Sequence, residues 1–492
     1  MLLQLIYFRI SFGILLFFLV GRYFAYGWID EDFINIQFNF PHFGWEFLKP
    51  LPPIGMLVLF GYLGVLSLCI IFGIAYRFSC IAFSLLFAYQ HLLDRTNFLN
   101  HYYLVFLLCI LASFLPLEKD SIVYDWIKIK SWHIWIIRFQ LGIVYFYGSL
   151  AKCKTDWMMN AEPLRIWLLM NRDLPLIGNI LTVKLTPYLF SYAGFLFDLF
   201  IFPLLLQKKT FKFAYLLVLI FHILTNILFP IGMFPFLMIF LTPICFPSRE
   251  FHKIILKFLN LYKIFLLKIS FCKYSLNKNG LLFLDSWNKL ASSIVLHFKS
   301  FLTKYNFLLL KRMNRDHFLI SQTRIQFSLS YLWRDNIFRD ATGITKIFFI
   351  IYFTLQLLLP FRYLLYPGNL LWTEEGFNFS WHIMIAHKSG YVDFFARDKV
   401  SGFKEKLNVR KLLTTKQWAQ MKTDPIMIYQ FAQFIGKLER EKGRRNFGIT
   451  VDSAVSLNGH PFHALIREDI DLLEVEFHLF RSNPWISRDW KD

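Results

Sequence analysis

Residues 54–74 read IGMLVLFGYLGVLSLCIIFGI, a run of 21 residues without one charged side chain. Because an α-helix rises about 1.5 Å per residue, this run would extend about 31 Å, close to the thickness of the hydrocarbon core of a bilayer. An uninterrupted apolar run of this length is typical of a transmembrane helix. The stretch therefore predicts one span of a membrane protein.

Eight further segments are similarly long and apolar, with about 17 to 25 residues each. The nine predicted spans cover 3–20, 54–74, 77–93, 101–117, 132–150, 186–206, 211–229, 231–247 and 345–365. The first lacks a basic region and a small-residue cleavage site, so we expect a retained span rather than a signal peptide. The sequence predicts a polytopic α-helical membrane protein of about nine spans.

The composition of the 492-residue chain supports this fold class. Apolar residues make up 56% of the chain and charged residues only 17%, and there are 59 phenylalanines. This composition disfavours a mainly soluble enzyme, a disordered scaffold and a secreted disulfide scaffold. The cysteines form no metal-ligand spacing, so we expect buried apolar thiols and no metal site. They are Cys69, Cys80, Cys109, Cys153, Cys245 and Cys272.

The net charge of +20 could indicate a nucleic-acid partner, but its distribution favours membrane topology. Residues 249–325 hold 14 Lys and Arg against three acidic residues, the pattern of a cytoplasmic connection beside anionic lipid. Its lysines recur among apolar residues, as on helices that lie in the interface, although one stretch could be a further span. We therefore expect a multi-pass cell (inner) membrane protein with a cytoplasmic N-terminus, an extracytoplasmic tail and no nucleic-acid partner.

Four regions follow from this topology. Residues 1–248 form a helical bundle that carries the active site, 249–344 a basic cytoplasmic or interfacial segment, 345–365 the last span, and 366–492 an extracytoplasmic domain. In the tail, Asp424-Pro425 predicts the start of a helix that runs to about Gly443. Alternating apolar residues over 449–457 predict a strand that ends at the turn Asn458-Gly459, and 473–479 alternates again. The tail is therefore predicted to be mostly antiparallel β.

Ionisable residues within spans are costly and are candidates for function. Each has a simpler interpretation: Lys152 could extend to the headgroups, His222 could be a hydrogen-bonded core residue, and Asp198 could pair with Arg138. The predicted topology, however, brings several polar features to one extracytoplasmic face. These are Asn100-His101, Lys152 and the Pro-Gly break within 229–235.

At these residues the sequence resembles the vitamin K-dependent γ-glutamyl carboxylase family, in the horizontally transferred transmembrane domain superfamily. The similarity runs from the N-terminus to about Trp485. The segments that carry it are 93–96 with Asn100-His101, 145–157 with 162–164, 221–222 through 231–234, 380–384 with His387, and 455–462. Their order and spacing make the set specific.

The resemblance implies a lyase that oxygenates reduced vitamin K to its epoxide. This step generates a strong base that removes a γ-proton from a glutamate of a protein or peptide, and CO2 adds to the carbanion. No ordinary side-chain base could remove the proton of so weak a C–H acid. The base must therefore be made from a cofactor, in a pocket that excludes water. The implied co-reactants are reduced vitamin K, O2 and CO2, with no metal.

The resemblance also implies roles for individual residues. Lys152 matches the base that deprotonates the hydroquinone. His101 matches a partner of the deprotonated substrate in the transition state, with Asn100 beside it. Further positions match the walls of the quinone and glutamate pocket, and they are His222, Met233, Phe234, Met384 and His387.

Some positions depart from the family pattern. Ala151 stands where vertebrate members carry a second lysine, Cys153 and Lys154 replace an apolar residue and Asp or Asn, and His382 replaces Asp or Arg. We find no match to the vertebrate carboxy-terminal extension and no clear propeptide site, features that resemble a bacterial homologue. The protein substrate, the native quinone and the oligomeric state stay open.

Two alternatives remain. One is a quinol epoxidase-type homologue without protein carboxylation, and the other is a non-enzymatic transporter or receptor. A transporter should show an internal repeat with paired broken helices, and the sequence shows one Pro-Gly break and no repeat.

Overall fold

The computed structural model describes residues 1–118, 129–258, 261, 341–488 and 490. The chain divides into two compact units, one of Met1–Glu250 with Asp340–Asp492 and one of Phe251–Arg339. Most of the basic segment predicted at 249–344 and Cys272 lie outside the described residues. The elements and cavities described below lie in the first unit.

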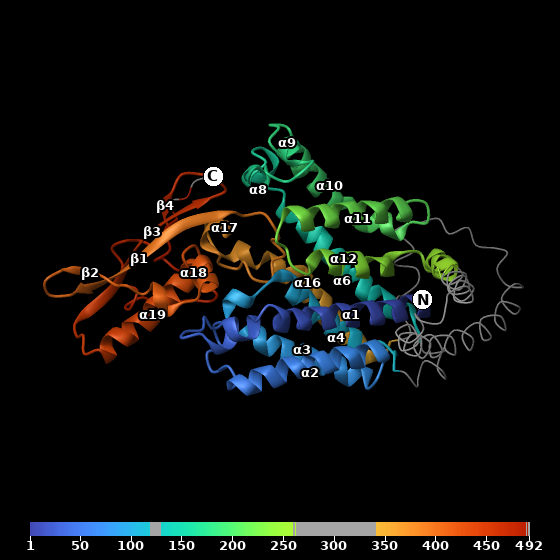
Figure 1. Ribbon diagram of the computed structural model, residues 1–492, viewed down its shortest axis with the longest axis horizontal. Helices are drawn as coiled ribbons and strands as arrows, with labels where there is room; N and C mark the ends of the chain where they lie inside the picture. The colour runs from blue at the N-terminus through green and yellow to red at the C-terminus, as the bar shows by residue number, and fades with distance from the viewer. Residues whose placement is uncertain (119–128, 259–260, 262–340, 489, 491–492) are drawn as a thin grey trace, which may run out of the picture. The chain divides into compact units, whose positions relative to one another are not determined.

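Each of the nine predicted spans coincides with a helical segment, which confirms the polytopic helical fold (Figure 1). Six segments are long and apolar enough to cross a bilayer among the residues searched, while Asn100–Ser113 and Phe234–Cys245 are shorter apolar helices. The helices are α1 (Leu2–Ala25), α2 (Pro53–Phe72), α3 (Tyr76–Leu92), α4 (Asn100–Ser113), α6 (Ser131–Ala151), α10 (Thr186–Leu206), α11 (Phe211–Leu228), α12 (Phe234–Leu241) and α16 (Gly343–Leu358).

Shorter elements connect these helices and complete the tail. They include α7 (Thr155–Met158), α8 (Leu164–Met170), α9 (Gly178–Leu181), α17 (Leu370–Thr373) and α18 (Thr415–Met421). Short 3-10 helices cover Arg95–Asn97, Thr242–Cys245, Leu359–Leu365 and Arg410–Leu412, and a π-helical turn covers Asp30–Ile34.

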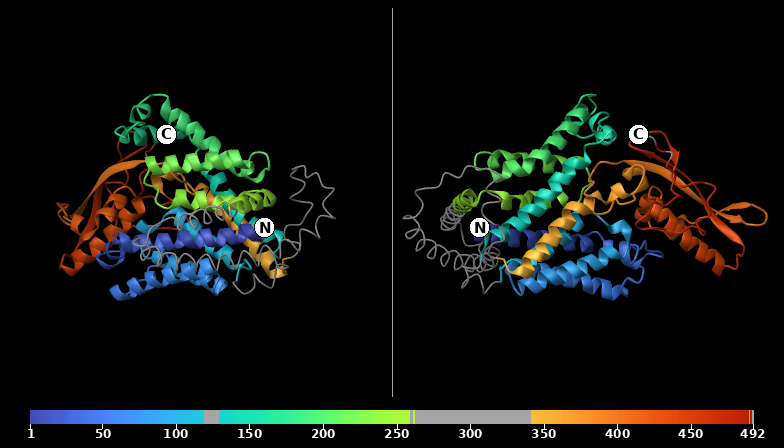
Figure 2. Two further views of the ribbon diagram at one scale, coloured as in Figure 1. Left: turned by 45° about the vertical axis from the view of Figure 1, so that its right-hand side comes forward. Right: turned by 180° about the vertical axis from the view of Figure 1, so that it is seen from behind.

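Close helix contacts depend on small residues. The helix α6 packs against α10, and α10 against α11 (Figure 2). A Cβ atom at Gly142 of α6 would lie 2.8 Å from the Phe202 ring of α10, so this contact requires a glycine.

The side chain of Arg138 on α6 donates to the carbonyls of Ile244 and Phe246, at 2.9 and 2.7 Å. The interpretation that Arg138 pairs with Asp198 is therefore wrong, because backbone oxygens already satisfy its guanidinium.

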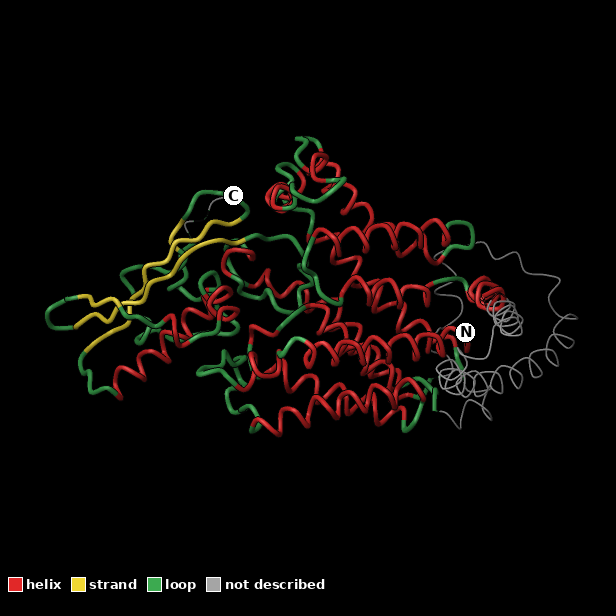
Figure 3. Tube along the Cα trace, viewed as in Figure 1, coloured by secondary structure: helices red, strands yellow, loops and turns green. Residues whose placement is uncertain are grey.

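The tail contains a small antiparallel sheet of order β2-β1-β3-β4 (Figure 3). Its strands are β1 (Lys388–Asp398), β2 (Lys404–Lys406), β3 (Phe447–Leu457) and β4 (His463–Ala464). The strand predicted at 449–457 is confirmed as β3, and the predicted helix as α19 (Pro425–Glu441). Its N-cap is Asp424, whose side chain accepts from the backbone amides of Ile426 and Met427 at 2.8 and 3.1 Å.

The strand predicted at 473–479 is wrong. Residues 471–474 form a turn and the residues after it are irregular. Side chains of α19 bind this segment instead of a neighbouring strand: Gln433 donates to the Leu472 carbonyl at 2.5 Å, and Tyr429 to the Val475 carbonyl at 3.3 Å. Leu473 packs so closely on Gly436 that a Cβ atom there would be 2.4 Å away. The alternation therefore reflects packing on a helix.

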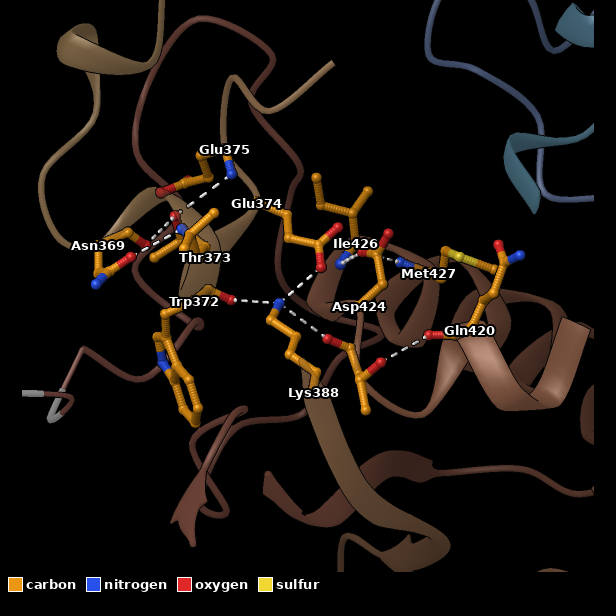
Figure 4. Close-up of polar contacts among 12 residues, drawn as sticks. Asn369, Trp372, Thr373, Glu374, Glu375, Lys388, Gln420, Asp424, Ile426 and Met427 are labelled. Carbon is orange, nitrogen blue, oxygen red and sulfur yellow. Dashed lines mark hydrogen bonds and ion pairs between the residues drawn. The ribbon is translucent and has the colours of Figure 1, made fainter. Parts of the chain in front are cut away.

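A network around Lys388 fixes the start of β1 (Figure 4). The Lys388 ammonium donates to Glu374 Oε1 at 2.6 Å and to the backbone carbonyls of Trp372 and Thr423 at 3.1 and 3.2 Å. Burial raises the pKa of Glu374 to about 7, and the ammonium of Lys388 opposes this shift. The network joins α17, β1 and the residues before α19.

The helix α18 of the tail docks on the turn between α3 and α4. Gln417 donates to Asp94 Oδ2 at 3.0 Å and to the Phe38 carbonyl at 2.8 Å. Lys416 donates to Asn97 Oδ1 at 2.6 Å and to Asp32 Oδ2 at 2.8 Å. These bonds hold the residues that directly precede Asn100 and His101.

A second docking point joins the tail to α7. The Asn458 amide donates to Asp156 Oδ2 at 3.0 Å, and His460 Nε2 lies 2.8 Å from Asp156 Oδ1. Asn458 and Gly459 have positive φ angles of 52° and 79°, as a tight hairpin turn requires. The turn predicted from sequence thus also contacts the bundle.

We predict that Asp94→Ala destabilises the whole first unit. The change leaves the backbone amide and hydroxyl of Thr96 and the amide of Gln417 without their acceptor. Each buried unsatisfied donor costs about 1–3 kcal/mol, so the thermal midpoint in detergent should fall by several degrees. Asp173→Ala is the control, because that side chain is 91% exposed. Equal midpoints for the two variants would contradict this docking role.

Candidate functional site

Lys152 lies at the C-terminal end of α6, and its side chain turns inward. Its Nζ atom donates to Asp198 Oδ2 on α10 at 2.6 Å and to the Gly148 carbonyl at 3.0 Å. It also lies 5.4 Å from the ring centre of Trp157. Lys152 and Asp198 are only 6% and 8% exposed. The ammonium is therefore held inside the bundle and does not extend to the headgroups.

The close approach of α6 and α10 makes this pair possible. A Cβ atom at Gly148 would lie 3.1 Å from Asp198 Oδ2, so a larger residue would crowd the carboxylate. Trp157 is anchored to α10 by two hydrogen bonds with Ser191: its indole donates to the Ser191 carbonyl at 3.0 Å, and the serine hydroxyl donates to the Trp157 carbonyl at 2.5 Å. The aromatic face beside the ammonium is thus fixed.

A small cavity of about 70 Å³ adjoins the pair. His222 lines it, with Nε2 3.4 Å from the Tyr145 hydroxyl and Nδ1 without a hydrogen-bond partner in the described chain. The remaining lining is mostly apolar. The cavity is therefore lined by an ion pair, an imidazole and otherwise mostly apolar side chains.

A larger cavity of about 870 Å³ holds Asn100 and His101 at the start of α4. Asn100 Oδ1 and His101 Nε2 are buried and have no hydrogen-bond partner among the described residues. Buried polar atoms are rarely left in this state unless a ligand or water satisfies them. Five apolar residues line both cavities and form what we call the shared wall: Phe229, Ile231, Phe234, Ile383 and Met384.

The part of the shared wall that comes from the tail is strained. Phe379, Trp381 and Met384 have positive φ angles of 68°, 57° and 55°, which non-glycine residues rarely adopt. His382 lies between them with Nδ1 2.9 Å from the Ser380 hydroxyl. Burial, together with the nearby charge of Lys154, lowers the pKa of His382 to about 3, so this imidazole is neutral at pH 7. Such strain is often kept at binding sites.

The structure brings most candidate residues together. Lys152, His222, Phe234 and Met384 line the small cavity, and Asn100, His101, Met233, Phe234 and Met384 line the large one. It does not bring His387 into this set, because that imidazole lies 3.2 Å from the Trp167 indole nitrogen and lines neither cavity.

Arg22 also lines the large cavity, and sequence reasoning missed it. The sequence feature that could have identified it is an arginine in the last turn of a span, followed by the aromatic residues Tyr23, Tyr26 and Trp28.

Two family models cover almost all of the described chain. Residues 3–249 match the HTTM domain, and residues 341–491 match the lumenal domain of vitamin K-dependent gamma-carboxylase. The chain belongs to the vitamin K-dependent gamma-carboxylase family. No solved structure matches the chain. In this gamma-carboxylase family member, the HTTM domain supplies Lys152 and His101, and the lumenal domain supplies Ile383 and Met384 of the shared wall.

We predict that the Lys152–Asp198 pair shows strong coupling in a double-mutant cycle. Lys152→Met or Asp198→Leu alone leaves one buried charge unpaired, which costs about 3–5 kcal/mol. The double variant should recover most of this loss, as measured by thermal unfolding in detergent. Lys406→Met is the control, because its ion pair with Asp393 is exposed and contributes little. Additive losses from the two single variants would show that the two side chains are not a charged pair.

Proposed function

We propose that the chain is a vitamin K-dependent γ-glutamyl carboxylase. It would couple oxygenation of reduced vitamin K to removal of a γ-proton from a protein glutamate and to addition of CO2. The observation that supports this best is the pair of adjoining cavities, with Lys152 in one, His101 in the other and one apolar wall between them. The match to the lumenal domain supports a carboxylase-like function, while the coupled reaction and its substrates are our proposal.

The residues fit a reduced quinone. The large cavity, at about 870 Å³, lies within the usual range of cofactor pockets of about 300–1,000 Å³. Its lining includes aromatic and apolar side chains, among them the shared wall, against which a quinone ring could pack. When bound, reduced vitamin K would supply, with O2, the strong base that no ordinary side chain provides.

In this proposal Lys152 takes up the proton of the quinol hydroxyl at Nζ. In the resting protein the Lys152 ammonium donates to Asp198 at 2.6 Å, so it can accept the quinol proton only after passing its own proton to that carboxylate. Asp198 can hold that proton while Lys152 accepts another. Met384 of the shared wall has the flexible thioether side chain that can move to admit a ring toward Lys152.

His101 serves the other substrate. Its Nε2 atom faces the large cavity without a partner, with Asn100 beside it. We assign this pair to the glutamate of a protein or peptide, which would enter beside the tail domain. The small cavity beside Lys152 is lined mostly by apolar side chains, which would keep water away from the base.

The experiment that tests the proposed function is Lys152→Ala. Epoxide formation and carboxylation should be lost together, because the second depends on the first. A small added amine should partly restore both, since the missing group is a proton acceptor. Purified protein in detergent would receive reduced vitamin K, a glutamate peptide and labelled bicarbonate, with epoxide and fixed label measured separately.

Two further variants sharpen this test. Lys154→Ala is the matched control, two residues away and lining neither of the two cavities, and it should keep both activities. His101→Ala should slow carboxylation more than epoxidation, because it acts on the glutamate side. Near-normal epoxidation in Lys152→Ala would remove Lys152 from the role of base.

We also propose that the N-terminus is cytoplasmic and the tail extracytoplasmic. Val400 of the tail is 83% exposed. Lys209 is exposed in the connection between α10 and α11. In a Cys153→Ser background, Val400→Cys should react with an impermeant thiol reagent in intact cells, and Lys209→Cys should not. The reverse labelling would overturn the orientation.

A further inference from the structure

Arg22, in the last turn of α1, is a cation of the large cavity that the reaction described above does not use. Its guanidinium lies 4.9 Å from the ring centre of Trp28 and 5.9 Å from that of Tyr26. Among the described residues it makes no ion pair and no hydrogen bond. The two rings therefore hold the planar group in place while its donors stay available.

The side chains of Arg22 and His101 both come close to Gly232 in the large cavity. Gly232 has a φ of 70°, and a Cβ atom there would lie 3.7 Å from His101 Nε2 and 3.8 Å from Arg22 Nη1. A side chain at this position would fill the space that both nitrogens face. The glycine leaves room beside its backbone, and a carboxylate lying there would be within reach of both nitrogens.

The other charged groups of this cavity are accounted for. Lys416 is paired with Asp32 at 2.8 Å and also donates to Asn97 at 2.6 Å. Glu31 is exposed. Arg22 is therefore the cation of the cavity lining that has no charged partner within the described chain. A buried, unpartnered imidazole beside an available guanidinium suits an anionic ligand.

We propose that Arg22 binds the γ-carboxylate of the substrate glutamate while His101 faces the carbon that loses its proton. A guanidinium matches a carboxylate with two parallel hydrogen bonds, which a lysine cannot supply. Removal of a proton beside a carboxylate builds a second negative charge, and a fixed cation stabilises that charge. This inference rests on the proposed function and adds the residue that distinguishes glutamate from glutamine.

The test is equilibrium binding of a fluorescent glutamate peptide to the purified full-length protein, without quinol. The same peptide with glutamine in place of glutamate is the reference ligand. The native protein should prefer the glutamate peptide. Arg22→Gln should weaken its binding by about 10- to 100-fold and abolish the preference, because a charge-assisted hydrogen bond is lost. Arg22→Lys should keep part of the preference.

Arg410→Gln is the matched control. That guanidinium also stacks on a tryptophan, 5.1 Å from the Trp418 ring centre, but it lines neither cavity. It should leave the glutamate preference unchanged. An undiminished preference in Arg22→Gln would overturn the inference. If Arg22→Gln does not fold, a full preference in Arg22→Lys would overturn it as well, since the paired hydrogen bonds would then be unnecessary.

The same variants separate this inference from the proposed function. Epoxide formation without peptide should be nearly unchanged in Arg22→Gln, while the KM for the glutamate peptide rises about 10- to 100-fold. Selective, Arg22-dependent peptide binding in a protein that forms no epoxide would contradict the proposed function and support the carboxylate site.

Discussion

The arrangement of the site depends on one buried ion pair, Lys152 with Asp198 at 2.6 Å. Two charges inside an apolar bundle are costly to desolvate, and removal of either would leave the other buried without its partner. The pair therefore ties the end of α6 to the middle of α10, and Gly148 provides the room for it. A replacement by apolar residues would avoid the desolvation cost, so its presence points to chemistry rather than to stability alone.

The second constraint is the docking of the tail on the bundle. Asp94, in the turn that follows α3, accepts a hydrogen bond from Gln417 of the tail, and Asp156, in the short helix α7, accepts one from Asn458. These bonds position the strained segment that contains Met384, so the shared wall of the two cavities is assembled from distant parts of the chain. The segments that carry the family resemblance thus include the docking points as well as the candidate reactive residues.

Sequence patterns predicted the nine helical segments, the capped helix at Asp424 and the strand β3, because apolar length, an N-cap and alternation each have a local cause. The strand β1 was not predicted, although Val392, Phe394 and Ala396 alternate on its buried face. The alternation at 473–479 arises from packing on α19. Polar residues within spans indicated the candidate site, but not its pairing: Asp198 pairs with Lys152, whereas Arg138 binds backbone carbonyls. Such partners depend on helix rotation and crossing, which one sequence does not specify.

The most direct measurement of the central claim is a coupled assay of the native protein in detergent. Reduced vitamin K, O2, labelled bicarbonate and a glutamate peptide would be supplied together, and epoxide and fixed label would be counted in the same sample. The account predicts that both products form and that fixation of label requires quinol. Epoxide without label would indicate an epoxidase-type homologue, and neither product from folded protein would contradict the account.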